Sequence, residues 1–332
     1  MVFSRKTAVC LIGILLVTLP YWSGNQYYLH VASLIGVYWI LIAGLNLVVG
    51  YTGQLSIGHV GLLAVGSYCY AILTHTYDVN PVISILAASV GGAISGLALG
   101  LPALRLPGFY FAMVTMAFTM IVSEFASARS DITGGGIGLS VQPFPYPFAD
   151  PNGFYWLVLM MGSAVTWFSW NIARQMWGRC LIAVRDSDVA AASVAIPIYR
   201  MKVTVFVFSG FVAGLAGSAF AVLQTYITPD TFSFDIGLFF FVAIIIGGRG
   251  VILGPLLGTA ILTSIPELIS SLAKYGTFFY GVVLLIIVLL LPDGVGPLLE
   301  RMVERIWPRA VRREPIKPDI QLLSETLSQL YK

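Results

Sequence analysis

Long apolar runs separated by short polar connections make up almost the whole chain. Between Thr7 and Leu104 the only Asp, Glu, Lys or Arg is Asp78. A helix needs about 20 apolar residues to cross the hydrocarbon core, so the pattern predicts about ten crossings, some short or broken by glycine. We expect them near residues 7–22, 29–50, 57–75, 82–104, 109–125, 153–171, 203–226, 237–247, 251–270 and 277–291. The pattern therefore predicts an all-α integral membrane protein.

Composition and charge agree with a lipid environment. The 332 residues are 58% hydrophobic and 10% charged, with a net charge of +3. Soluble chains carry about 25% charged residues. This apolar composition makes the lipid bilayer an expected partner. The net positive charge is small and spread along the chain, so nucleic acid is not an expected partner.

Lys and Arg sort to one side when the crossings are threaded alternately through a membrane. With the N-terminus inside, only Arg129 and Lys274 among the basic residues up to 291 fall outside. The inner ones are Arg5, Lys6, Arg105, Arg174, Arg179, Arg185, Arg200, Lys202 and Arg249. Inner loops carry an excess of Lys and Arg, so we expect both termini to be cytoplasmic.

Three segments stand apart from the crossings. Residues 126–152 form a Gly- and Pro-rich outer loop, and residues 172–202 form a charged inner loop; both belong to a membrane domain expected over residues 1–295. The tail 296–332 contains "LLERMVERIW" and "LLSETLSQLY", which are amphipathic at helical spacing. We expect the tail to lie in the cytoplasm, against the membrane surface or a partner, with disorder as the alternative.

The second half of the charged inner loop predicts a short helix. Asp186, Ser187 and Asp188 are residue types that cap helix N-termini. They precede "VAAASVAI", a short helix-forming run that we expect Pro197 to end.

The first half of the charged inner loop predicts another short helix. In "RQMWGRCLIAV", Trp177, Leu181 and Val184 recur at helical spacing, with Arg174 and Arg179 between the apolar positions. Two short helices with a small, Ala-rich surface would suit docking of another protein. The alternative is an ordinary basic loop that only holds the topology.

The stretch "GYTGQLSIGHVG" at residues 50–61 places four glycines among polar side chains in an apolar context. Non-helical backbone at membrane depth occurs where it is buried in protein or lines a wet cavity, and a helix break would offer helix-end groups to a polar solute. The alternative is that the glycines permit close helix packing. His59 has no acidic neighbour in sequence, so a satisfied buried histidine is favoured over a proton carrier.

No nucleotide-binding or catalytic motif occurs in the sequence. The patterns G-x-x-x-x-G-K-[ST], H-E-x-x-H and G-x-S-x-G and a Cys/His metal spacing are all absent. We therefore expect neither an enzyme nor a cofactor in this chain. An ion-coupled secondary transporter stays as an alternative, but it would carry ionisable groups in mid-span, whereas the carboxylates here sit near span ends or in loops.

Several stretches together resemble the permease subunits of bacterial branched-chain amino acid ABC transporters. They are "GLNLVVGYTGQLSIGHVGLLAVGSY" at 44–68, "LPALRLPGFYFAMVTMAF" at 101–118, "TGGG" at 133–136, "AVRDSDVAAASVAIPIYRMKVTVFVFSGFVAGLAGSAFA" at 183–221 and "IIIGGRGVILGPLLGTAIL" at 244–262. Permeases for urea and short-chain amides are similar. The resemblance covers roughly residues 30–295.

The resemblance implies roles for particular residues. The loop 172–202 would hold a coupling helix that fits a groove on the ATP-hydrolysing subunit. Its implied coupling residues are Arg179, Arg185, Asp186, Asp188, Ala190, Ala191 and Ile196. Candidate residues of the translocation path are Asn46, Gly53, Gln54, Ser56, Gly58 and His59. The inner turns are marked by Arg105, Gly248 and Arg249, and the outer loop by Thr133, Gly134 and Gly135.

These roles leave two points open. Arg105 and Arg249 would serve equally as arginines that anchor the topology by snorkelling to the membrane surface. The sequence also departs from the family before Ile196, where a glycine is usual: here Val194 and Ala195 stand instead.

The resemblance also implies an assembly. The chain would form half of the translocation path of an importer in the bacterial inner membrane. Its partners would be a second, homologous permease subunit, two cytoplasmic ABC ATPase subunits that bind ATP and Mg, and a periplasmic or extracellular substrate-binding protein. The implied cargo is a branched-chain amino acid, with urea or a short-chain amide as the alternative.

Overall fold

The structure is a computed structural model that describes residues 25–106, 108–269, 281 and 285. The crossing expected at 7–22, most of the one expected at 277–291, and the tail 296–332 lie outside the described residues. The helices are α2 (Gln26–Asn46), the π-helix η1 (Leu47–Tyr51), α3 (His59–His75), α4 (Pro81–Ala103), α5 (Phe109–Ala128), α6 (Ser130–Thr133), α7 (Pro151–Arg174), α8 (Met176–Asp186), α9 (Asp188–Ser193), α10 (Ile198–Gln224), the 3-10 helix η2 (Pro229–Phe232), α11 (Phe234–Gly247) and α12 (Gly254–Ile269).

Six helical segments of the described part are long and apolar enough to cross a membrane. They are Gln26–Tyr51, Pro81–Ala103, Phe109–Ala128, Pro151–Arg174, Ile198–Gln224 and Pro229–Gly247. The expected crossings at 57–75 and 251–270 correspond to the shorter helices α3, with 17 residues, and α12, with 16. The structure therefore confirms an all-α membrane protein. Each of the eight crossings expected between residues 29 and 270 coincides with a helix of the described part, and the total of ten stays a prediction.

Local sequence signals set several helix boundaries. The side chain of Asn25 accepts a hydrogen bond from the Tyr27 amide and so caps α2. Asn80 caps α4 in the same way, and Pro81 follows at the first helical position, where its missing N–H costs nothing. Helix α10 ends at Gln224, and the next residue, Thr225, has a left-handed backbone.

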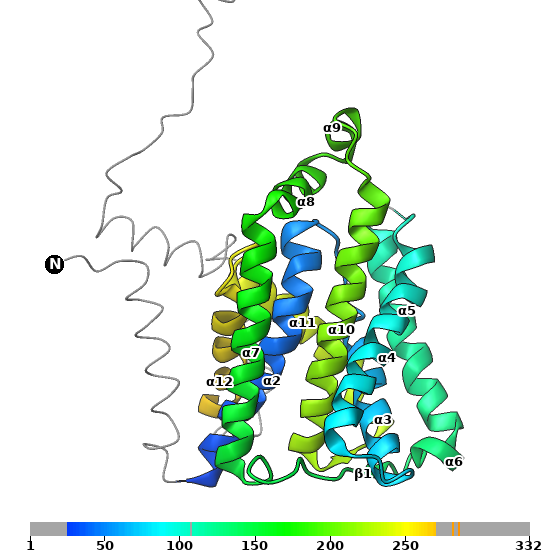
Figure 1. Cartoon of the computed structure of the whole chain (residues 1–332), viewed down its shortest axis with the longest axis vertical. Coiled ribbons are helices and arrows are strands. Elements are labelled where there is room, and N and C mark those ends of the chain that lie inside the picture. Colours follow the sequence, from blue (N-terminus) through cyan, green and yellow to red (C-terminus); the bar gives the residue numbers. More distant parts are fainter. Residues whose placement is uncertain (1–24, 107, 270–280, 282–284, 286–332) are drawn as a thin grey trace, which may run out of the picture.

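Helix α10 lies at the centre of the bundle and packs against α4, α3 and α2 (Figure 1). Its apolar stretch is 78% buried, against 22% for that of α7. Glycines allow this close packing: a Cβ added at Gly214 would lie 2.3 Å from the Ala88 carbonyl oxygen, and one at Gly92 would lie 2.3 Å from the Gly210 carbonyl oxygen. Such small-residue contacts are typical of helices packed within membranes.

The two ends of the bundle differ in structure and charge. Helices α8 and α9 project at one end, and α6 lies at the other with a short antiparallel ribbon of β1 (Leu139–Ser140) and β2 (Tyr226–Ile227) (Figure 1). The basic inner loop thus lies opposite the Gly-rich outer loop. This placement agrees with the predicted sorting of charge, and the assignment of the α8 and α9 end to the cytoplasm stays a prediction.

Candidate functional site

Two short helices form the charged inner loop, as the sequence predicted. Leu181 and Val184 of α8 are buried, whereas Trp177 is half exposed. The Ser187 side chain caps α9 by accepting from the Ala190 amide at 3.2 Å. The carboxylate of Asp188 pairs with the Lys202 ammonium at 2.8 Å, which ties α9 to the first turns of α10.

The end of α9 differs from the prediction that Pro197 ends it. Helix α9 ends at Ser193, and Ala195 follows in the left-handed region with φ 59°. The Ala195 amide donates to the Ala192 carbonyl and the Ile196 amide to the Ala191 carbonyl, a pattern in which helices end on a left-handed residue. Pro197 instead precedes the first residue of α10. The left-handed turn expected to favour glycine is thus built here with alanine.

Replacing Ala195 by glycine is expected to stabilise α9. An L-residue with a Cβ in the left-handed region costs about 1 kcal/mol or more relative to glycine. Hydrogen exchange of the α9 amides in Ala195→Gly should therefore slow about fivefold. The control Ala192→Gly lies within the helix and should accelerate exchange, since glycine there costs about 0.5–1 kcal/mol. Equal rates in Ala195→Gly and the parent would contradict a strained turn.

The outer surface of α9 is small and apolar. Val189 is 81% exposed and Val194 is 67% exposed, while Ala191 faces inward at 1%. Ala190 is exposed beside Val189. We call Val189, Ala190 and Val194 the α9 knob. Of the other residues implied in coupling, Arg179 and Asp186 are exposed and Ile196 is partly buried.

Three segments far apart in sequence meet where α2 passes into η1. The Asn46 carboxamide donates to the Val251 carbonyl at 2.9 Å and accepts from the Gly250 amide at 3.0 Å. The Arg185 guanidinium of α8 donates to the Gly50 carbonyl at 2.9 Å. We call Asn46, Gly50, Arg185, Gly250 and Val251 the inner junction. It joins a residue implied in the path, Asn46, to one implied in coupling, Arg185.

Glycine at position 50 is required by this junction. A Cβ on Gly50 would lie 2.3 Å from the Asn46 side-chain oxygen and 2.4 Å from the Gly250 amide nitrogen. Real side chains do not approach so closely, so any larger residue would separate the η1 backbone from the turn between α11 and α12. The same turn contains Gly248, buried with φ 97°, and the exposed Arg249.

Residues 52–58 between η1 and α3 are not helical, as a break in this segment would require. Two α5 hydroxyl groups satisfy the start of α3: the Thr115 hydroxyl accepts from the Ile57 and Gly58 amides, each at 3.3 Å, and the Thr119 hydroxyl donates to the Gly58 carbonyl. A Cβ at Gly58 would lie 1.8 Å from the Thr115 carbonyl oxygen. Glycine at position 58 therefore permits close packing of the start of α3 against α5.

His59 is buried and hydrogen-bonded at both ring nitrogens. Its Nδ1 lies 2.8 Å from the Ser56 hydroxyl and its Nε2 lies 2.8 Å from the Ser209 hydroxyl of α10. Its ring also packs edge-on against Phe206. The imidazole therefore joins the broken segment to the central helix, an arrangement that suits a satisfied structural histidine.

Gln54 and Gly53 occupy the same break beside the inner junction. The Gln54 side-chain oxygen is buried and has no hydrogen-bond partner among the described residues. Gly53 is exposed and left-handed, with φ 72°. The Gln54 side chain thus has unused hydrogen-bonding capacity.

The remaining candidates lie at turns. Arg105, after α4, stacks over the Tyr199 ring of α10 at 5.8 Å. At the opposite end, the Thr133 hydroxyl donates to the Arg129 carbonyl and accepts from the Gly135 amide, while Gly134 ends α6 with φ 72°. The structure thus makes Thr133, Gly134 and Gly135 one compact turn.

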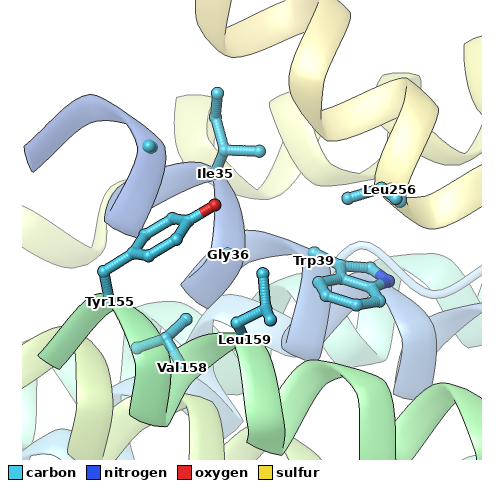
Figure 2. Close-up of a pocket in the computed structure, with 8 residues that line it drawn as sticks. Ile35, Gly36, Trp39, Tyr155, Val158, Leu159 and Leu256 are labelled. Atoms are coloured by element: carbon cyan, nitrogen blue, oxygen red, sulfur yellow. The ribbon is translucent and has the colours of Figure 1, made fainter. Parts of the chain in front are cut away.

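An apolar pocket lies between α2, α7 and α12 (Figure 2). Trp39, Tyr155 and Leu256 are among its lining residues, and its cavity volume is about 20 Å³. Ligand pockets usually measure about 300–1,000 Å³. The pocket is therefore too small to hold an amino acid.

Sequence reasoning missed three residues that build this site. Thr115 and Thr119 lie one turn apart on α5, and Ser209 lies in the middle of α10. Hydroxyl residues in helices commonly bond back to a carbonyl of their own helix, so their sequence positions did not show that they reach a break far away in the chain.

These features define a multi-pass membrane protein with a broken segment inside its bundle and a helical knob at one end. The chain belongs to the family described as the permease component of branched-chain amino acid transport systems, which it matches over residues 27–291. No solved structure matches it.

Curated relatives of the chain are transport permease proteins. The chain is 30% identical over 295 residues to the high-affinity branched-chain amino acid transport system permease protein LivM of Escherichia coli K12, covering 81% of this chain and 69% of LivM. It is 22% identical to a probable LivM of Methanocaldococcus jannaschii, covering 79% of this chain and 91% of that protein. It is 28% identical to the fructose import permease protein FrcC of Rhizobium meliloti, covering 67% and 62%.

Proposed function

We propose that this chain is the membrane-spanning permease subunit of an ATP-driven importer in the bacterial inner membrane and forms half of a translocation path for branched-chain amino acids. The observation that carries the proposal is the 30% identity to LivM over 81% of the chain. The described structure supports it with a broken intramembrane segment and a projecting helical knob. Such a chain changes the access of a path and makes no bonds itself.

The proposed complex supplies what the sequence lacks. Two ABC ATPase subunits bind ATP and Mg and dock on the α9 knob, a second homologous permease subunit completes the path, and an external binding protein delivers the cargo at the α6 end. The knob supports this arrangement because Val189 is 81% exposed, and covering its apolar side chain with a protein groove is favourable.

The proposed path lies along residues 46–59. These residues carry no formal charge at neutral pH when His59 is neutral, so amide groups and helix ends would meet the ammonium and carboxylate of a zwitterion. The apolar side chain of leucine or valine needs no fixed charge. A sugar or a short amide would also suit neutral polar groups, and the closer match to LivM than to FrcC favours an amino acid.

Deletion of the gene in the source cells tests this proposal. Deletion of the gene for this chain is expected to abolish ATP-dependent uptake of radiolabelled L-leucine, and expression of the intact chain should restore it. Uptake of labelled urea, acetamide and fructose, measured in parallel, should be unaffected by the deletion. Loss of urea, acetamide or fructose uptake with leucine uptake intact would overturn the proposed cargo, and leucine uptake that persists without ATP would favour an ion-coupled transporter.

A further inference from the structure

The end of η1 leaves backbone carbonyls that need donors from elsewhere. The Val48 carbonyl accepts from the Thr52 hydroxyl at 2.6 Å and from the Gln54 amide at 3.3 Å. The Gly50 carbonyl accepts from the Arg185 guanidinium at 2.9 Å. A cation is favoured at a helix C-terminus, where the carbonyl dipoles point outward. The last helical turn before the break is therefore held by a residue of α8.

Arg185 also contacts the chain beyond the break. Gly53 has no side chain where the arginine stem passes: a Cβ there would lie 2.8 Å from the Arg185 Cγ. The guanidinium also lies beside the turn between α11 and α12, since a Cβ on Gly250 would lie 3.4 Å from the Arg185 Nη1. One side chain thus lies against residues before and after the break and against a third segment.

Asn46 makes the two sides of the junction a single unit. Its carboxamide holds both the amide of Gly250 and the carbonyl of Val251. Both bonds are long-range, at sequence separations of 204 and 205 residues. A displacement of the η1 turn would therefore move the start of the α11–α12 turn with it, because paired hydrogen bonds fix orientation as well as distance.

Alternative partners of Arg185 within the described residues are weak. Its Nε lies 3.3 Å from the carboxylate of Asp186, the next residue, which is exposed. Exposed ion pairs contribute about 0–1 kcal/mol. The backbone bond to Gly50 and the stem contact with Gly53 are thus the contacts that fix its position.

We propose that Arg185 is the positioning residue through which a displacement of α8 and α9 reaches the broken segment 52–58, with the inner junction moving as one unit. The inference rests on the proposed function and deepens it. It gives Arg185 a partner inside this chain, the Gly50 carbonyl, in place of a surface contact with the ATPase. Loss of the arginine would leave docking intact and separate ATP hydrolysis from cargo movement.

The test compares ATP hydrolysis and leucine uptake in proteoliposomes that contain the full complex with its binding protein. In Arg185→Ala, assembly and basal ATP hydrolysis should be retained, while labelled L-leucine uptake falls about tenfold, within the range of coupling between sites. The number of ATP molecules hydrolysed per leucine should rise accordingly. Arg185→Lys keeps a charged donor, so its leucine uptake should lie between that of the parent and that of Arg185→Ala.

The matched control is Arg200→Ala, which removes an exposed arginine from the first turn of α10 outside the junction. It should keep the parental ratio of ATP to leucine. An unchanged ratio in Arg185→Ala would overturn the inference, as would loss of assembly in both Arg185→Ala and Arg185→Lys, which would mark a merely structural role. A parental complex that moves no leucine with ATP would instead overturn the proposed function.

Discussion

Replacing Gly214 by leucine is expected to prevent the helix bundle from folding. A Cβ at this position would lie 2.3 Å from the Ala88 carbonyl oxygen and 2.9 Å from the Ser89 Cα. Both atoms are backbone, so no side chain can turn aside, and α4 and α10 would have to separate. Excess volume in a packed interior costs about 1–3 kcal/mol even where side chains yield. Detergent-extracted Gly214→Leu should therefore show at least about tenfold less monodisperse protein, since ~1.4 kcal/mol already changes an equilibrium tenfold.

Gly136→Leu is the matched control for this experiment. Gly136 lies in the outer loop, is exposed, and has nothing within 4 Å of an added Cβ. Size-exclusion profiles and thermal unfolding of Gly136→Leu should equal those of the parent. A monodisperse Gly214→Leu with parental thermal stability would show that α4 and α10 do not pack as closely as the structure places them.

The same packing shows what hydropathy can predict. The α4 and α10 boundaries, Pro81–Ala103 and Ile198–Gln224, fall close to the predicted 82–104 and 203–226. Apolar runs of sufficient length and polar connections carry that information directly. Neither run predicts the contact between Gly214 and Ala88. Small residues indicate that a helix can pack closely, but they do not show which helix it packs against.

The candidate site shows the same division. The two short helices and the Ser187 cap followed from local residue preferences. The turn at Ala195 did not, because an alanine there is an exception to the glycine that such turns favour. The bond between Arg185 and Gly50 joins residues 135 apart, and one sequence without tertiary information gives no signal for such a pair.

Burial also decides which residues can test the coupling surface. Ala191 is 1% exposed, and Asp188 is paired with Lys202. Substitution of Ala191 or Asp188 would disturb α9 itself, so a loss of ATPase binding would not show that either residue contacts the ATPase. Val189 is 81% exposed on the first turn of α9, so its side chain can be changed without altering the packing within the chain.

Val189→Arg is accordingly expected to abolish association with the ATPase while the chain still inserts and folds. Covering a small apolar surface with a partner groove is favourable, whereas burying an unpaired guanidinium there is strongly unfavourable. A residue at the centre of such a contact contributes about 2 kcal/mol or more. Co-purification with the ATPase subunit should weaken at least ~30-fold, and labelled leucine uptake should be lost with it.

The control Ile137→Arg makes the same change at an equally exposed position, since Ile137 is 82% exposed in the loop at the opposite end of the bundle. The ATPase should remain bound to Ile137→Arg. A general effect of added charge on membrane insertion would appear in both variants, whereas an effect on docking would appear in Val189→Arg alone. Parental ATPase binding and uptake in Val189→Arg would remove the α9 knob from the coupling surface. The contact would then have to lie on other residues exposed at that end, such as Arg179 and Asp186 on α8.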